Sequence, residues 1–149
     1  MYTINRYIKE KILKKLEPNK VVVIYGPRRV GKTTLIHELL SGLNLKSMLL
    51  SGEDRRAREW LSSQSIKTLK ENIGDNELLV IDEAQKVDKI GLSLKLIVDH
   101  LPEIKVIATG SSSFELANQV GEPLVGRKWQ FILYPLSQIE MSEYEKQPV

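Results

Sequence analysis

The feature of this 149-residue chain that most restricts its fold is residues 26–33, which fit the pattern G-x-x-x-x-G-K-[ST] in full. Two glycines at this spacing let the backbone curl without Cβ clashes, so that successive N–H groups point inward at an anion. An apolar, β-branched run, Val21 to Tyr25, precedes the segment, and residues 32–41 follow it with the pattern of a helix. A strand, this loop and a helix in that order predict a phosphate-binding loop within an α/β domain.

We expect the loop to bind a nucleotide, with ATP and Mg²⁺ as its ligands; a glycine turn that binds nothing is the structural alternative. Lys32 would place its ammonium against the β- and γ-phosphates, and the Thr33 hydroxyl would be a magnesium ligand. No N-K-x-D guanine-reading motif occurs in the chain, which disfavours GTP. The predicted nucleotide-binding residues are Gly26, Pro27, Arg28, Arg29, Val30, Gly31, Lys32, Thr33 and Thr34.

Two acids, Asp82 and Glu83, end the apolar run at residues 78–81. Acids at the end of a buried strand are costly unless a cation or solvent meets them. We expect Asp82 to hold the magnesium ion, directly or through water. Glu83 is one residue further and points elsewhere, and it is the candidate for polarising the attacking water. The alternative interpretation is a pair of acids that caps a helix.

Hydroxyl side chains follow the next predicted strand, at the end where ligands bind in parallel sheets. Thr109 or Ser111 is the candidate sensor, a group that contacts the γ-phosphate or the attacking water, whereas Ser113 is expected to cap the following helix. Arg127 precedes the last predicted strand. It could act as a finger on the nucleotide of a neighbouring subunit in a homo-oligomer, or it could be an ordinary surface arginine.

Strand and helix patterns alternate along the rest of the chain. Apolar residues at helical spacing predict an amphipathic N-terminal helix over residues 3–17, ended by Pro18. The other predicted strands are residues 47–51, 78–81, 104–108 and 128–134, and the other predicted helices are residues 55–73, 92–101, 114–120 and 137–146. This alternation predicts one α/β domain with a mostly parallel sheet.

Composition and charge exclude several classes of protein. The chain has no cysteine, so a disulfide framework and a thiolate metal site are excluded, which fits the cytoplasmic location that we expect. The longest apolar run is too short to cross a membrane, and the lysine-containing N-terminus does not resemble a signal peptide. Residues 1–32 carry nine Lys or Arg and two Glu, a net charge of +7 against −4 for residues 33–149. An anionic ligand explains part of this excess; a nucleic-acid surface and a solvated helix face are alternatives for the rest.

With these elements in place, the chain resembles the N-terminal AAA-type ATPase domain (AAA_14) of prokaryotic proteins that also carry a C-terminal DUF4143 domain. The matching stretches are GPRRVGKTTL (26–35), LLVIDEAQKV (78–87), IATGSSSFEL (107–116) and EPLVGRKWQFILYPLSQIE (122–140). The resemblance implies a three-layer P-loop NTPase fold of the RecA/AAA type with strand order 5-1-4-3-2. We therefore expect residues 1–149 to form a single ATPase core, without the C-terminal lid and second domain of that family.

Two functions from different classes follow from these features. The first is an ATPase, in which magnesium-dependent hydrolysis drives or times a conformational change. The second is a nucleotide-gated binding module, which hydrolyses little ATP and reports its occupancy to a partner or to DNA. A small-molecule kinase is disfavoured, because the acid pair suits water activation and no arginine-rich lid segment occurs.

Overall fold

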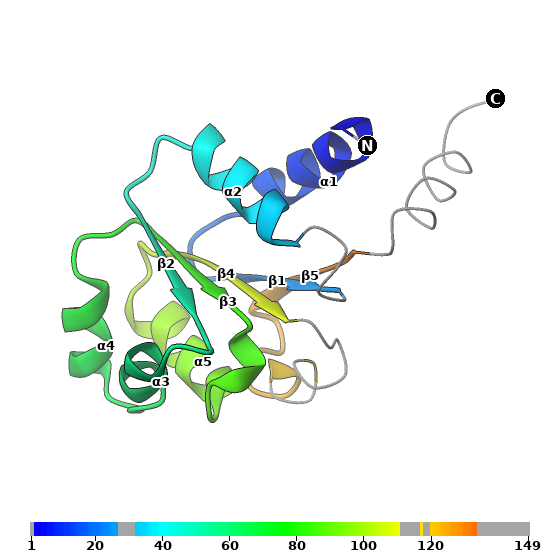
Figure 1. The fold of residues 1–149 in the computed structure, drawn as a ribbon. Coiled ribbons are helices and arrows are strands. Elements are labelled where there is room, and N and C mark those ends of the chain that lie inside the picture. The colour runs from blue at the N-terminus through cyan, green and yellow to red at the C-terminus, as the bar shows by residue number, and fades with distance from the viewer. Residues whose placement is uncertain (1, 27–31, 111–116, 118–119, 134–149) are drawn as a thin grey trace.

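The computed structural model describes residues 2–26, 32–110, 117 and 120–133 of the chain (Figure 1). The strands in these ranges are β1 (Val21–Tyr25), β2 (Ser47–Ser51), β3 (Leu78–Asp82), β4 (Lys105–Gly110) and β5 (Lys128–Ile132). The helical segments are α1 (Tyr2–Lys15), α2 (Lys32–Gly42), α3 (Arg55–Leu61), α4 (Ile66–Ile73), the short 3₁₀ turn η2 (Ala84–Lys86) and α5 (Ile90–His100). The helices predicted at residues 114–120 and 137–146 lie largely or wholly outside the described residues.

The strands form one parallel sheet in the order β2-β3-β4-β1-β5, which confirms the expected fold class and strand order. β1 lies between β4 and β5 and is buried along its whole length, as its continuous apolar sequence predicts. The register aligns Tyr25 with Gly110 and Ser51 with Asp82. The carboxyl ends of β1, β2, β3 and β4 therefore meet along one edge of the sheet.

Helices cover both faces of the sheet, with α1 and α2 on one side and α3, α4 and α5 on the other (Figure 1). Alternate side chains of β1 pack into the two helical layers. Val22 and Ile24 pack with α1 and α2, whereas Val21 and Val23 pack with the opposite layer. Burying each such side chain contributes roughly 1.5–3 kcal/mol to folding. None of the described helices is long and apolar enough to cross a lipid bilayer.

The single helix predicted over residues 55–73 is wrong in one respect, because the structure divides it into α3 and α4. Ser62 ends α3, and the Ser65 hydroxyl accepts a hydrogen bond from Thr68 N at 3.2 Å as the N-cap of α4. Between them Gln64 has φ of 55°, which no continuing helix allows. Serine side chains compete with the helical hydrogen bonds in this way, which explains the break.

Candidate functional site

The structure has the strand, loop and helix that a phosphate-binding loop requires. β1 leads directly into Gly26, whose N–H donates to the carbonyl of Gly110 at 3.1 Å and so ties the start of the loop to β4. Lys32, Thr33 and Thr34 lie in the first turn of α2. The predicted loop residues Pro27, Arg28, Arg29, Val30 and Gly31 lie outside the described residues. The site roles predicted for all of these residues stay predictions.

Asp82 and Thr109 meet at the carboxyl edge of the sheet, where β3 and β4 lie side by side. The Thr109 hydroxyl, which is fully buried, donates to Asp82 Oδ1 at 2.5 Å. The same carboxylate oxygen accepts the backbone N–H of Glu83 at 3.1 Å. Two donors on one carboxylate oxygen fix the orientation of the side chain. Thr109 is thus bonded to Asp82 in this structure, and Ser111, the other candidate sensor, lies outside the described residues.

Glu83 leaves the strand in a left-handed backbone conformation, with φ of 53° and ψ of 47°. This conformation is uncommon for a residue with a side chain and costs on the order of 1–3 kcal/mol unless its surroundings enforce it. The residue is only 8% exposed, and Gln85 Nε2 donates to Oε2 of its carboxylate at 2.8 Å. Sequence spacing gives no sign of this contact, because only the turn formed by η2 brings the side chains of Glu83 and Gln85 together.

The donors at this edge fit a magnesium ion bound together with phosphates. Mg²⁺ usually keeps several waters and takes one or two carboxylates plus the oxygens of its phosphate ligand. Asp82 offers one oriented carboxylate at the end of β3. β4 lies between β3 and β1, the strand that leads into the loop. Within the described ranges, His, Asp and Glu side chains do not gather in threes, so a metal cage made only of protein ligands is not seen there.

Tyr25, the last residue of β1, adds a buried phenol beside the loop. Its hydroxyl has no hydrogen-bond partner among the described residues. Burial raises the pKa of Tyr25 above its ordinary value, because the charged phenolate would lose its hydration. Tyr25 therefore remains neutral at physiological pH and brings no negative charge to the strand that leads into the phosphate loop.

Arg127 is not brought to this edge of the sheet. Its carbonyl accepts the N–H of Val21 at 2.7 Å, which places it at the amino end of β1, roughly 15 Å along the strand from Gly26. Its guanidinium donates from Nε to Asp99 Oδ1 at 2.8 Å and so ties the start of β5 to α5. The structure thus gives Arg127 a contact within its own chain, and a finger acting on another subunit stays a prediction.

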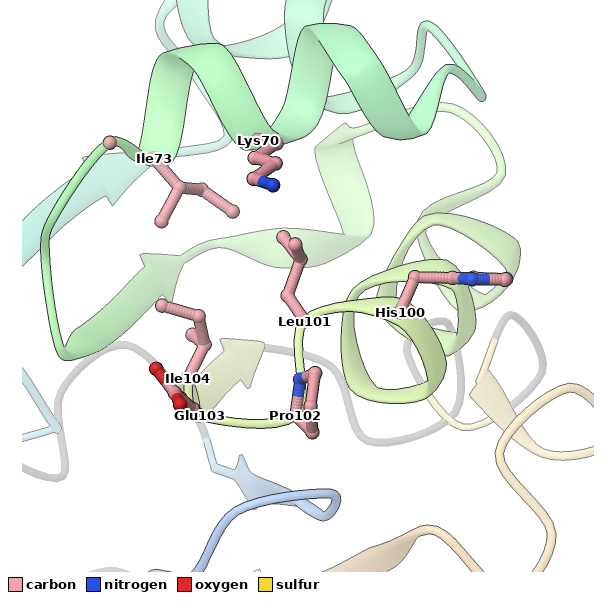
Figure 2. Close-up of a pocket in the computed structure, with 8 residues that line it drawn as sticks. Lys70, Ile73, His100, Leu101, Pro102, Glu103 and Ile104 are labelled. Carbon is pink, nitrogen blue, oxygen red and sulfur yellow. The ribbon is translucent and has the colours of Figure 1, made fainter.

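A cavity of ≈ 280 Å³ lies at the same amino edge and is separate from the candidate site. Figure 2 shows Lys70 and Ile73 reaching from α4 toward Leu101 and Ile104, which belong to the segment between α5 and β4. β4 begins directly after this segment, so the cavity opens at the opposite end of the strand from Thr109.

Comparison with known families gives a match over most of the chain. The model of a family described as an AAA domain matches residues 18–142. Two uncharacterised proteins of Methanocaldococcus jannaschii are each 29% identical to the chain, over 145 and 142 residues, which are 95% and 87% of this chain. The alignments cover 32% and 29% of those proteins, so the chain spans about a third of the length of these relatives.

Comparison with solved structures supports the same fold. A Walker-type ATPase of Pyrococcus abyssi superposes with a TM-score of 0.57 at 18% identity, over 97% of this chain and 57% of that one. The replication initiator DnaA, bound to AMPPCP and single-stranded DNA, superposes with a TM-score of 0.62 at 16% identity, over 96% and 51% of the two chains. At these identities the likeness concerns the fold alone.

Proposed function

Because the chain belongs to the AAA domain family, we propose that it binds magnesium-ATP at the carboxyl edge of β1, β3 and β4 and hydrolyses the γ-phosphate to drive or time a conformational change. Family membership supports nucleotide binding and an ATPase-like function, and the Walker-type ATPase and AMPPCP-bound DnaA share the fold. The observation that carries the finer proposal is the Asp82–Thr109 hydrogen bond, with the buried Glu83 one residue away. We also propose that residues 1–149 act as one core unit, because helices cover both faces of a single sheet.

Each residue has a distinct part in this proposal. Lys32 and the amide groups of the loop bind the phosphates, while Thr33 and Asp82 hold magnesium, which neutralises charge on the phosphate oxygens when it is bound. Thr109 keeps the Asp82 carboxylate oriented. Glu83 orients the attacking water and accepts its proton, and the Gln85 amide fixes the direction of the Glu83 carboxylate.

The direct test is calorimetry of ATP binding with and without Mg²⁺, with GTP as the control nucleotide, followed by measurement of phosphate release. We expect ATP to bind only weakly without Mg²⁺. Magnesium-ATP at a concentration 100-fold above its dissociation constant should stabilise the fold by about 2.7 kcal/mol. Binding without phosphate release would favour a nucleotide-gated module over an ATPase. A chain that binds neither nucleotide would contradict both functions.

Replacing Thr109 by valine is expected to slow magnesium-dependent ATP hydrolysis by roughly 10- to 100-fold, because a hydrogen bond to a charged group contributes about 1.5–3 kcal/mol. Valine has nearly the shape of threonine but cannot donate to Asp82. Thr109→Ser retains the hydroxyl and serves as the matched control. The measurement is phosphate release across a range of Mg²⁺ concentrations. Equal rates in Thr109→Val and the wild type would show that Asp82 needs no orientation by this hydroxyl.

A second candidate function, association with single-stranded DNA, is favoured by positive charge gathered where α1 meets β5. Lys14 and Lys15 end α1 and are exposed, and the ammonium groups of Lys15 and Lys20 lie 4.1 and 5.2 Å from the centre of the Trp129 ring.

We expect the double substitution Lys14→Glu and Lys15→Glu to weaken DNA binding and to reduce its salt dependence by about 0.7 in the log–log slope for each phosphate that the protein no longer neutralises. Lys67→Glu, an exposed change on α4, is the control, and it changes the net charge by as much as one of the two test substitutions does. Absence of binding by the wild type at low salt would exclude this function.

A further inference from the structure

The turn after β2 lies directly against the backbone of Glu83. Gly52 is buried, and its N–H donates to the carbonyl of Asp82 at 2.6 Å, one step beyond the last aligned pair of β2 and β3. A Cβ at Gly52 would lie 2.0 Å from the carbonyl oxygen of Glu83 and 2.9 Å from its carbonyl carbon. Contacts this short with backbone atoms do not occur, so any side chain here would have to displace Glu83.

The same turn is fixed from its other side by α3. Arg58 Nη1 donates to the carbonyls of Gly52 and Glu53, at 3.2 and 2.8 Å. Within the turn, the N–H of Glu53 donates to Ser51 Oγ at 3.1 Å and the N–H of Asp54 to the Ser51 carbonyl at 3.0 Å. The turn cannot retreat from Glu83 without breaking several of these bonds, so it acts as a rigid stop.

The turn lies against the backbone of Glu83, the residue that has the strained left-handed conformation. A left-handed conformation at a residue with a side chain persists only where its surroundings enforce it. The Glu83 carbonyl lies between the Cα side of Gly52 and the N–H of Lys86, which donates to it at 3.1 Å in η2. This carbonyl therefore cannot rotate toward the ordinary extended conformation without meeting the turn or breaking the bond from Lys86.

We propose that Gly52, backed by Arg58, is a positioning residue that holds Glu83 in its left-handed conformation and so turns the carboxylate toward Gln85. The inference rests on the proposed function, since it concerns the group that would orient the attacking water. Neither residue has a part in phosphate or magnesium binding. The effect of changing either one should therefore appear in the turnover of bound ATP and leave ATP affinity unchanged.

The first test is the variant Gly52→Ala, read by amide hydrogen exchange. We expect the N–H of Lys86 to exchange about ten-fold faster, because the displaced Glu83 carbonyl no longer accepts it. Gly42→Ala is the matched control, since a Cβ there would meet only the flexible end of the Lys9 side chain, at 3.3 Å. Unchanged protection of Lys86 in Gly52→Ala would overturn the inference whether or not the protein hydrolyses ATP.

A second variant, Arg58→Ala, adds no atoms to the turn and decides the question if Gly52→Ala does not fold. It should also accelerate exchange at Lys86, and Arg58→Lys, which keeps one donor, should restore part of the protection. Full protection in a folded Arg58→Ala protein, with Gly52→Ala also protected or unfolded, would overturn the inference.

The kinetic test separates a positioning role from a general loss of structure. We expect Gly52→Ala to lower kcat on the order of 100-fold at an unchanged KM, as misplacement of a reacting group does. In a Glu83→Gln background the same change should have no further effect, because it acts through that carboxylate. If Glu83→Gln lowers turnover and Gly52→Ala does not, the inference fails while the proposed function stands. If the wild type has no turnover, the proposed hydrolysis fails and hydrogen exchange alone decides the inference.

Discussion

Replacing Lys32 by alanine is expected to weaken the binding of magnesium-ATP by roughly 100-fold, because a charge-assisted contact to phosphate contributes up to about 3 kcal/mol and its removal leaves phosphate charge unmatched. Lys32 begins α2, directly after the loop, where its ammonium would add to the positive end of the helix dipole. The fold should be unaffected, since alanine favours a helix at least as well as lysine.

Calorimetry on the wild type and on Lys32→Ala measures this effect, with thermal unfolding as a second readout. ATP should raise the melting temperature of the wild type and leave that of Lys32→Ala nearly unchanged. Lys67→Ala, an exposed change on α4, is the matched control and should bind ATP like the wild type. Undiminished ATP binding by Lys32→Ala would mean that the nucleotide binds elsewhere and that the interpretation of residues 26–33 is wrong.

Replacing Glu83 by glutamine is expected to reduce ATP hydrolysis by about 10²- to 10⁴-fold while ATP binding remains, because an amide cannot accept the proton of the attacking water. Glutamine keeps the size of the side chain, and its carbonyl oxygen can still accept the hydrogen bond from Gln85 Nε2. The reduced rate should therefore reflect the missing charge and not a change of shape.

Phosphate release under saturating magnesium-ATP measures this second effect. Glu59→Gln, on the exposed side of α3, removes only a surface pair with Arg55 and should leave the rate unchanged. A Glu83→Gln protein that hydrolyses ATP at the wild-type rate would remove Glu83 from the mechanism. A wild type that binds ATP tightly with no turnover would instead favour the nucleotide-gated module.

Much of the fold could be predicted from local patterns. β1 lies where its continuous apolar run predicts it, because a strand buried by its neighbours needs little beyond an apolar, β-branched sequence. β2 also has its predicted bounds, although it is only partly buried at the edge of the sheet. The strand order came from the family resemblance, since periodicity alone does not say which strands are neighbours. The break at residues 62–65 was missed, because three serines close together favour caps only when the chain also turns there.

The site could be predicted in its residue types and not in its contacts. Asp82 and Thr109 were both placed at the carboxyl edge, but the bond between them depends on the alignment of β3 with β4. The contact of Glu83 with Gln85 depends on a left-handed residue that no spacing rule predicts. Gly52 is not predicted for a similar reason. The clash that a Cβ would make at this position arises only when β2 lies beside β3.

The two tryptophans of the chain lie in different layers of the fold, and this gives the protein a pair of internal fluorescent reporters. Trp60 on α3 packs against the core on the face of the sheet that α3, α4 and α5 cover. Trp129 on β5 donates to Glu17 Oε1 at 3.2 Å, beneath the lysines near the end of α1. Replacing either one by phenylalanine leaves an emitter in one layer only. Nucleotide-induced movement of the helices on the two faces of the sheet could then be followed separately by ordinary emission spectra.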